Sequence, residues 1–304
     1  MARALLVLLA AAAGGHAAVV PWMNAADGVA NPAAVVFPVP QVRVSVLTGG
    51  VVRMEYAASG EAGAFDDDAT LAFVKRRFDT PPPFTTVTSP DGATVTLTTP
   101  TAVLTFDTAA AAIGLGQPGA VTARLTVAPY STWTPAAAPT GNLHGTIRTL
   151  DRVNDPLNLA CPPVTTLYVY YSHCEEGVVS RDGWVLIDDT MRPRIPRGSG
   201  WPAAPHGGGT RADGTYLDWV LFTHGHDYKA ALRDFTALSG PIPLAPRYAL
   251  GPAFSRWYQW NDLENTEIVQ SGFADNGIPL DVLVVDMDWY VLPRLVCVLL
   301  GVWS

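Results

Sequence analysis

The sequence is poor in cysteine and in positive charge. It has 3 cysteines in 304 residues, and 19 Lys and Arg against 27 Asp and Glu, a formal net charge of −8 at pH 7. The longest basic cluster is Lys75-Arg76-Arg77. Because proteins that bind nucleic acid or an anionic membrane normally present a basic face, we expect no nucleic acid and no membrane among its partners. A neutral or weakly charged substrate fits better.

Metal ligands at a recognisable spacing are also missing. The chain has no Cys-x-x-Cys, and the pair His224 and His226 lacks a third ligand at a recognisable distance along the sequence. In an oxidising compartment Cys161 and Cys174 could bridge the ends of a hairpin, and whether they pair stays open; Cys297 has no obvious partner. We predict neither a metal nor a cofactor.

The N-terminus has the layout of a signal peptide. One positive charge, on Arg3, precedes the apolar run 4–13, and small residues stand at −3 and −1 of a cut after Ala17. The run is too short to span a bilayer as a helix. The alternative is a buried helix at the start of a domain. We predict a signal peptide over 1–17, and therefore secretion or entry into the secretory pathway.

Most of the chain consists of short alternating segments. With 49% hydrophobic and 15% charged residues it can bury a sizeable core. Apolar residues alternate with polar ones in short runs separated by turn signals, and no helical pattern lies between them. This predicts a mainly β fold, an antiparallel β-sandwich. The clearest runs are 42–46, 95–97, 102–106, 166–171, 184–187 and 216–222.

Three stretches interrupt this pattern. Residues 109–119, 135–140 and 197–214 are rich in Ala, Gly and Pro. Because they show no apolar periodicity of their own, we predict surface insertions that add nothing to the core.

The pattern changes after Asp227. Tyr228, Ala231, Leu232, Phe235 and Leu238 recur at helical spacing before Gly240. Prolines at 241, 243 and 246 then form a stiff connector, a plausible domain boundary near 245. Beyond it the sequence predicts a strand over 249–254, a helix over 261–276 capped by Asn261 and Glu264, and an apolar parallel strand over 280–285.

Two carboxylates follow this last strand. Asp286 and Asp288 are two residues apart, so they share a face at its carboxyl end. Aromatic faces beside carboxylates suit a sugar ring. The alternative is that the carboxylates cap the next loop and that the aromatic residues pack in the core. The aromatic residues near this end are Trp257, Tyr258, Trp260 and Trp289.

Several segments together resemble glycoside hydrolase family 31, the retaining α-glucosidases and α-xylosidases. Their order along the chain is the order in that family, and they extend over roughly 42–289. They are Gly141–Asp151, Gly177–Asp189, Asp218–Tyr228, Ser255-Arg-Trp257 and Asp286-Met-Asp-Trp289.

The resemblance implies a galactose-mutarotase-like β-sandwich over 18–245 and the first β-α-β of a (β/α)8 barrel over 246–289. Asp286 matches an aspartate that hydrogen-bonds sugar hydroxyls in the −1 subsite. Trp257 or Tyr258 matches an aromatic near the same subsite, which Met287 lines less specifically. With Asp288 and Trp289 these residues form the predicted substrate-binding set, and the substrate is an oligosaccharide or α-glucan.

The chain departs from the family after Trp289. Family members use an aspartate on strand 4 as nucleophile and a later one as acid/base, and neither position occurs here, while 290–304 resembles nothing in the family. We therefore predict a truncated retaining α-glycosidase with no catalytic residue, inactive alone, whose residues beyond about 246 pack poorly or lean on the sandwich. Two alternatives are a non-catalytic carbohydrate-binding module, and a catalytic pair formed by Asp286 and Asp288 themselves.

Overall fold

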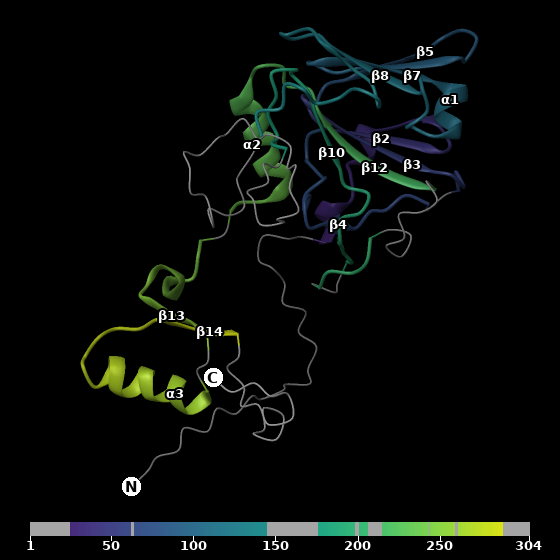
Figure 1. The fold of residues 1–304 in the computed structure, drawn as a ribbon. Helices are drawn as coiled ribbons and strands as arrows, with labels where there is room; N and C mark the ends of the chain where they lie inside the picture. The colour runs from purple at the N-terminus through teal and green to yellow at the C-terminus, as the bar shows by residue number, and fades with distance from the viewer. Residues whose placement is uncertain are drawn as a thin grey trace, which may run out of the picture. The chain divides into compact units, whose positions relative to one another are not determined.

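The computed structural model describes residues 25–61, 64–144, 176–197, 201–205, 215–242, 244–258 and 261–287. The chain divides into two compact units, Met1–Pro241 and Ile242–Ser304 (Figure 1). Within the described ranges, no helix is long and apolar enough to cross a membrane. Several sequence predictions lie outside these ranges, among them the signal peptide, the strand over 166–171, the three cysteines, most of the insertion over 197–214 and the tail over 290–304.

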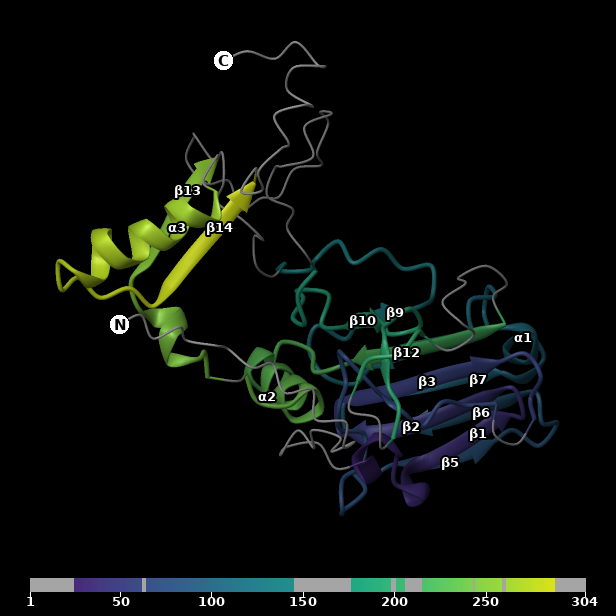
Figure 2. The same ribbon diagram turned by 90° about the horizontal axis from the view of Figure 1, so that it is seen from below.

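The first unit contains a five-stranded antiparallel sheet in the order β1-β2-β3-β12-β10. β12 pairs with β3 along its whole length, from Tyr216 opposite Ala57 to Phe222 opposite Val51, and the two strands lie side by side in Figure 2. The strands predicted over 42–46, 184–187 and 216–222 are confirmed here. The bounds are β1 Val35–Val39, β2 Val42–Thr48, β3 Val51–Ala57, β10 Val185–Asp188 and β12 Tyr216–Phe222.

A second five-stranded antiparallel sheet follows the chain order β5-β6-β7-β8-β9. Neighbouring strands follow each other along the chain, with helix α1 (Thr108–Ile113) between β7 and β8, and the sheet contains the predicted runs 95–97 and 102–106. Its bounds are β5 Thr85–Thr88, β6 Thr94–Thr98, β7 Ala102–Asp107, β8 Val121–Leu125 and β9 Thr132–Trp133. A two-stranded sheet pairs β4 (Ala69–Thr70) with β11 (Arg194–Ile195), and η1 (Ala25–Gly28) and η2 (Pro32–Ala34) precede β1.

One hydrophobic cluster takes side chains from both large sheets. Val44, Met54 and Leu221 of the first sheet join Leu104 of the second in it, all at most 1% exposed. Across the two sheets, Trp133 meets Trp219 edge to face, with ring centroids 6.2 Å apart. Figure 1 shows the two sheets as separate layers. The prediction of a mainly β fold with antiparallel sheets is confirmed.

The segment 109–119 is not the surface insertion that its composition predicted. Residues Thr108–Ile113 form helix α1, whose first turn is capped by the Asp107 side chain accepting from Ala110 N at 2.9 Å. Ala111 and Leu115 are fully buried in the cluster between the sheets. Six residues are too few to show a helical period, so the sequence did not reveal this contribution to the core.

Helix α2 (Tyr228–Ser239) follows β12, as predicted. Asp227 caps it by accepting from Ala230 N at 3.0 Å, and Gly240 follows it with φ 85°. Leu238 is fully buried and packs with Phe73 in a second, smaller cluster. Leu232, which the predicted apolar face included, is 49% exposed, so that face is narrower than the sequence indicated.

The second unit is a β-α-β segment. Strands β13 (Ala253–Tyr258) and β14 (Val282–Met287) are parallel, and between them run α3 (Asp262–Glu267) and the π-helical segment η5 (Ile268–Ala274). Asn261 and Glu264 form the predicted capping box. The strand predicted over 249–254 is wrong at its start, because η4 (Arg247–Leu250) is a 3-10 turn there.

The apolar strand β14 is less covered than its composition predicted. Val284 and Val285 are 42% and 47% exposed, although an apolar run of this kind is typical of a strand covered on both faces. Among the described residues β14 pairs only with β13. This part of the chain therefore leaves apolar side chains in contact with water.

Candidate functional site

The carboxyl ends of β13 and β14 meet at one edge of their sheet. The strands are parallel, with Arg256 opposite Val285 and Tyr258 opposite Met287. Trp257 therefore stands at the same level as Asp286, one position before each strand ends. Four of the six predicted substrate-binding residues, Trp257, Tyr258, Asp286 and Met287, are brought to this edge by the backbone; Asp288 and Trp289 lie outside the described residues.

Helical residues cover one face of this two-stranded sheet (Figure 2). The ring of Phe254 on β13 meets that of Phe273 on η5 at a centroid distance of 5.3 Å and an angle of 65°. Arg256 lies two positions further along β13 and lines a cleft with Glu264 and Glu267 of α3. Since residues two apart on a strand point the same way, Phe254 and Arg256 define the helix-covered face.

A close backbone approach holds the opposite end of the same two strands together. The Asp281 and Val282 N–H groups donate to the Pro252 carbonyl oxygen at 3.0 and 3.2 Å. A Cβ atom at Gly251 would lie 1.9 Å from Asp281 Oδ2, so a larger residue there would require this exposed side chain to move. The two backbone hydrogen bonds to Pro252 therefore fix the start of the β13–β14 pairing.

The structure brings together a second set of charged groups that the sequence did not indicate. Arg53 on β3 and Asp218 on β12 pair through two contacts, Nε to Oδ1 at 2.8 Å and Nη2 to Oδ2 at 2.5 Å. Arg53 Nη2 also lies 2.9 Å from Glu55 Oε1, and Arg43 Nε donates to the other Glu55 oxygen at 2.7 Å. Arg53, Glu55 and Asp218 are all at most 3% exposed.

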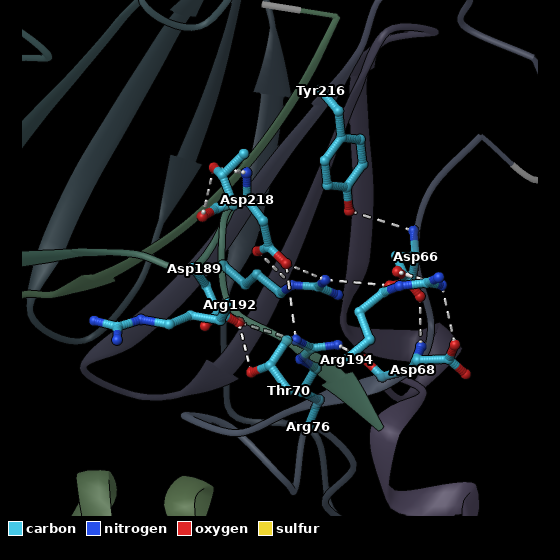
Figure 3. Close-up of a pocket in the computed structure, with 11 residues that line it drawn as sticks. Asp66, Asp68, Thr70, Arg76, Asp189, Arg192, Arg194, Tyr216 and Asp218 are labelled. Atoms are coloured by element: carbon cyan, nitrogen blue, oxygen red, sulfur yellow. Dashed lines mark hydrogen bonds and ion pairs between the residues drawn. The ribbon is translucent and has the colours of Figure 1, made fainter. Parts of the chain in front are cut away.

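Asp189, one residue past the end of β10, extends this network. Its Oδ2 accepts from Thr70 Oγ1 at 2.8 Å and from Arg76 Nη2 at 3.2 Å, as Figure 3 shows. Arg76 Nη2 is also 3.7 Å from Asp218 Oδ2. These side chains line a small cavity with room for about one water molecule, and Asp66, Asp68 and Arg194 line it too.

The pKa values of the two aspartates shift in opposite directions, although burial raises both. Burial raises the pKa of Asp218, but the charge and hydrogen bonds of Arg53 outweigh it and hold that pKa below its ordinary value. Burial, and then the charge of Asp218, raise the pKa of Asp189 to about 7. Arg53 stays charged, since Asp218 and Glu55 outweigh its burial and raise its pKa well above the usual value.

A histidine and a carboxylate also meet where β12 ends and α2 runs back. His224 Nε2 lies 2.7 Å from Asp234 Oδ2, which also accepts from Thr48 Oγ1 at 2.5 Å. A Cβ atom at Gly50 would lie 2.6 Å from the His224 ring, so glycine is needed beside it. Within the described residues no group of three or more His, Cys, Asp or Glu is placed to hold a metal ion.

The charged network was missed because its members come from distant segments. Asp189 and Asp218 stand at the ends of two segments quoted for the family resemblance, yet nothing in the sequence pairs them with Arg53 or Arg76. One feature of the sequence could have indicated the charged network. Arg53 and Glu55 interrupt the otherwise apolar run of β3, and charged residues inside an apolar strand require partners when they are buried.

Comparison with known protein families gives a match in the second unit. Residues 242–295 match the model of the glycosyl hydrolases family 31 TIM-barrel domain. The resemblance to glycoside hydrolase family 31 is confirmed. A segment of 78 residues is 37% identical to Alpha-glucosidase 2 of Bacillus thermoamyloliquefaciens. This segment covers 26% of this chain and 10% of the length of that relative.

Solved structures of family 31 enzymes are also similar. A GH31 dextranase of Flavobacterium johnsoniae, complexed with isomaltotriose or with glucose, is 15% identical at a TM-score of 0.44, over 82% of this chain and 31% of that one. The GH31 α-xylosidase of Xanthomonas citri is 20% identical at a TM-score of 0.23, over 32% and 10%. At these scores the likeness does not by itself establish a shared fold.

Proposed function

We propose that this chain is the first part of a retaining α-glycosidase of family 31 that acts on α-linked glucosides or xylosides. The match of residues 242–295 to the family's barrel domain carries the proposal. The parallel β13-α3-β14 segment agrees with it, because strands joined through a helix in this way are the repeating unit of that barrel. The two packed antiparallel sheets then correspond to the family's galactose-mutarotase-like sandwich.

The proposed sugar contacts lie on the face of the sheet opposite the helix. Phe254 and Arg256 mark the helix-covered face, so strand alternation assigns positions 257 and 286 to the other face. Those two positions stand at the same level in the parallel register. We therefore favour Trp257 over Tyr258 as the aromatic residue beside Asp286, with the indole under a sugar ring and the carboxylate accepting from its hydroxyls.

Tyr258 and Met287, at the ends of the two strands, remain proposed contacts on the family resemblance. Asp288 and Trp289 remain proposed contacts on the family resemblance. The substrate is an oligosaccharide or α-glucan, in keeping with the sugars bound by the Flavobacterium johnsoniae dextranase. We also keep the proposed division into a signal peptide over 1–17, a sandwich domain over 18–245, a barrel start over 246–289 and a tail over 290–304, and the proposed secretion.

We further propose that the 304-residue chain does not hydrolyse glycosides alone. A retaining mechanism needs a carboxylate nucleophile and a carboxylic acid about 5–5.5 Å apart. In the family both come from later barrel strands than the two found here. The chain then supplies part of the sugar-binding edge and none of the groups that form or break the glycosidic bond.

The purified chain tests this with a nitrophenyl α-glucoside. We expect no release of nitrophenol above buffer. Turnover by the wild-type chain that disappears in Asp286→Asn but persists in Asp275→Asn would instead make Asp286 part of a catalytic pair. Asp275 is a suitable control because it is exposed and lies outside both strands.

The messenger RNA supplies the second test. Sequencing it across the codons for Trp289 and Tyr290 should reveal a form that encodes further barrel strands. In that longer protein Asp286→Asn should lower kcat/KM by about 10- to 100-fold, the scale of a lost hydrogen bond to a charged group. An unchanged kcat/KM would reject the sugar contact assigned to Asp286 and leave the family assignment standing.

A further inference from the structure

Three buried polar atoms of the charged network have no hydrogen-bond partner among the described residues. They are Arg53 Nη1, Arg76 Nε and Asp189 Oδ1. Their residues come from β3, from the segment after β4 and from the position after β10, and each is at most 2% exposed. The other nitrogen and oxygen atoms of these three side chains all have partners. One atom on each side chain is therefore left over.

The same three residues line one cavity, the small one with room for about one water molecule (Figure 3). A buried donor or acceptor without a partner is costly, because it has lost its hydrogen bonds to water and gained none. Buried water molecules in proteins typically serve such groups and make about three hydrogen bonds each. Three unpartnered atoms around a cavity of this size indicate that one small molecule completes all three bonds.

The charges around the cavity favour a neutral molecule over an ion. Four arginines and four aspartates line it, so their opposite charges balance when all are ionised. An anion would meet the unpartnered carboxylate oxygen of Asp189, and a cation would meet the N–H groups of Arg53 and Arg76. The charged lining residues are Arg53, Arg76, Arg192, Arg194, Asp66, Asp68, Asp189 and Asp218.

We propose that this cavity is the site of one buried water molecule, which accepts hydrogen bonds from Arg53 Nη1 and Arg76 Nε and donates one to Asp189 Oδ1. Water suits these three atoms because it can accept two hydrogen bonds and donate two. The site concerns the first unit alone and does not depend on the glycosidase assignment.

The proposed water adds a link between three segments that are far apart in the sequence. Arg76 and Asp189 already form an ion pair at 3.2 Å, and Arg53 pairs with Asp218 rather than with Asp189. The water connects Arg53 to the Arg76–Asp189 pair. It also gives the Asp189 carboxylate a third hydrogen bond, beside those from Thr70 and Arg76, and so favours its ionised form.

Nuclear magnetic resonance of the full 304-residue chain tests the site in solution. The Nε–H of Arg76 should give a cross peak with water that has opposite signs in nuclear Overhauser and rotating-frame spectra. This pattern marks a water molecule held for longer than the protein takes to tumble, whereas proton exchange gives the same sign in both. Arg43 is the internal control, since its Nε–H donates to Glu55 at 2.7 Å and it does not line the cavity. A missing cross peak at Arg76 would overturn the proposal.

Two substitutions of Asp189 test its part in the site. Asp189→Asn keeps a side-chain oxygen that can accept from the water, so the Arg76 cross peak should remain. Asp189→Leu puts an apolar group of similar size in the same place, and the cross peak should be lost. A cross peak that persists in Asp189→Leu, or that is lost in both variants, would overturn the hydrogen bond assigned to Asp189.

A crystal structure of the wild-type chain decides the matter should Asp189→Leu not fold. Crystals grown with bromide as the halide distinguish a water molecule from an anion by anomalous scattering. We expect one oxygen atom about 2.7–3.2 Å from Arg53 Nη1, Arg76 Nε and Asp189 Oδ1. A bromide ion in the cavity, or direct pairing of these three atoms with one another, would overturn the proposal.

Discussion

Arg53 and Asp218 form a two-contact ion pair between β3 and β12, the two strands with the longest pairing in the first sheet. Both residues are at most 3% exposed. A slip of one residue between the strands would turn every side chain of one strand to the opposite face and separate this pair. The pair therefore helps to define the register that brings Glu55 opposite Asp218.

Removing one partner of this pair should be costly. Arg53→Met leaves the buried carboxylate of Asp218 without its main cation, and we expect a loss of about 3–5 kcal/mol in the free energy of unfolding. Urea denaturation followed by circular dichroism measures it. Arg124→Met, at an exposed position of β8, is the control and should change the same free energy by less than about 0.5 kcal/mol. Similar losses in the two variants would show that the pair does not stabilise the fold.

Two glycines with positive φ should respond differently to a methyl group. At Gly225 (φ 61°) a Cβ atom would lie 2.1 Å from the Ala128 carbonyl oxygen, whereas at Gly92 (φ 69°) it would meet nothing within 4 Å. Gly92→Ala should cost about 1–2 kcal/mol of stability from backbone strain alone. Gly225→Ala should cost clearly more, because the His224–His226 turn must also move. Thermal unfolding compares them, and equal losses would mean that the contact with Ala128 is relieved without strain.

Leu238 and Leu232 on α2 provide a test of which helix face packs on the sheet. Leu238 is fully buried with Phe73 and Phe222, and Leu232 is 49% exposed. Leu238→Ala should lower the free energy of unfolding by about 2–5 kcal/mol. Leu232→Ala removes the same atoms from a position largely in water and should cost less than about 1 kcal/mol. The reverse order in urea denaturation would contradict the observed orientation of α2.

Asp234 should contribute to acid unfolding. Burial raises its pKa, but hydrogen bonds from His224 and Thr48 outweigh this and hold the pKa below 3.8. The folded state therefore binds a proton less readily than the unfolded state, so the stabilisation is present above pH 3.8 and is lost as the pH falls through the folded pKa.

In Asp234→Asn the fall in Tm between pH 5 and pH 2.5 should be smaller than in the wild type. Asp79→Asn, at an exposed position, should leave that fall unchanged. Differential scanning calorimetry measures both. An Asp234→Asn curve parallel to that of the wild type would show that the contacts to His224 and Thr48 do not stabilise the carboxylate.

Patterns within single elements could be predicted from the sequence. The alternation of Val42, Val44 and Val46 indicated β2, and Asn261 with Glu264 indicated the start of α3. These predictions succeeded because strand alternation and helix capping depend on residues only two to four positions apart. The same local reasoning missed α1, whose single turn and a half shows too little period to be recognised.

The candidate sugar site was predictable in part for the same reason. Asp286 and Trp257 were named from the strand ends and from the family resemblance. Their position opposite each other in the β13–β14 register could not be predicted. The residues that pair in two parallel strands depend on the length of the whole segment between the strands. Which face of the sheet the helical residues cover was decided by the contact between Phe254 and Phe273.

The sequence by itself determined the acidic charge, the mainly β character, the position of the β-α-β segment and the resemblance to family 31, since composition and short motifs carry these properties. Only the tertiary structure decided the partners of the buried charges. Arg53 and Asp218 are 165 positions apart, and Asp189 and Thr70 are 119 apart. Long-range pairs of this kind depend on the order of strands in the sheets, and no local pattern in the chain encodes that order.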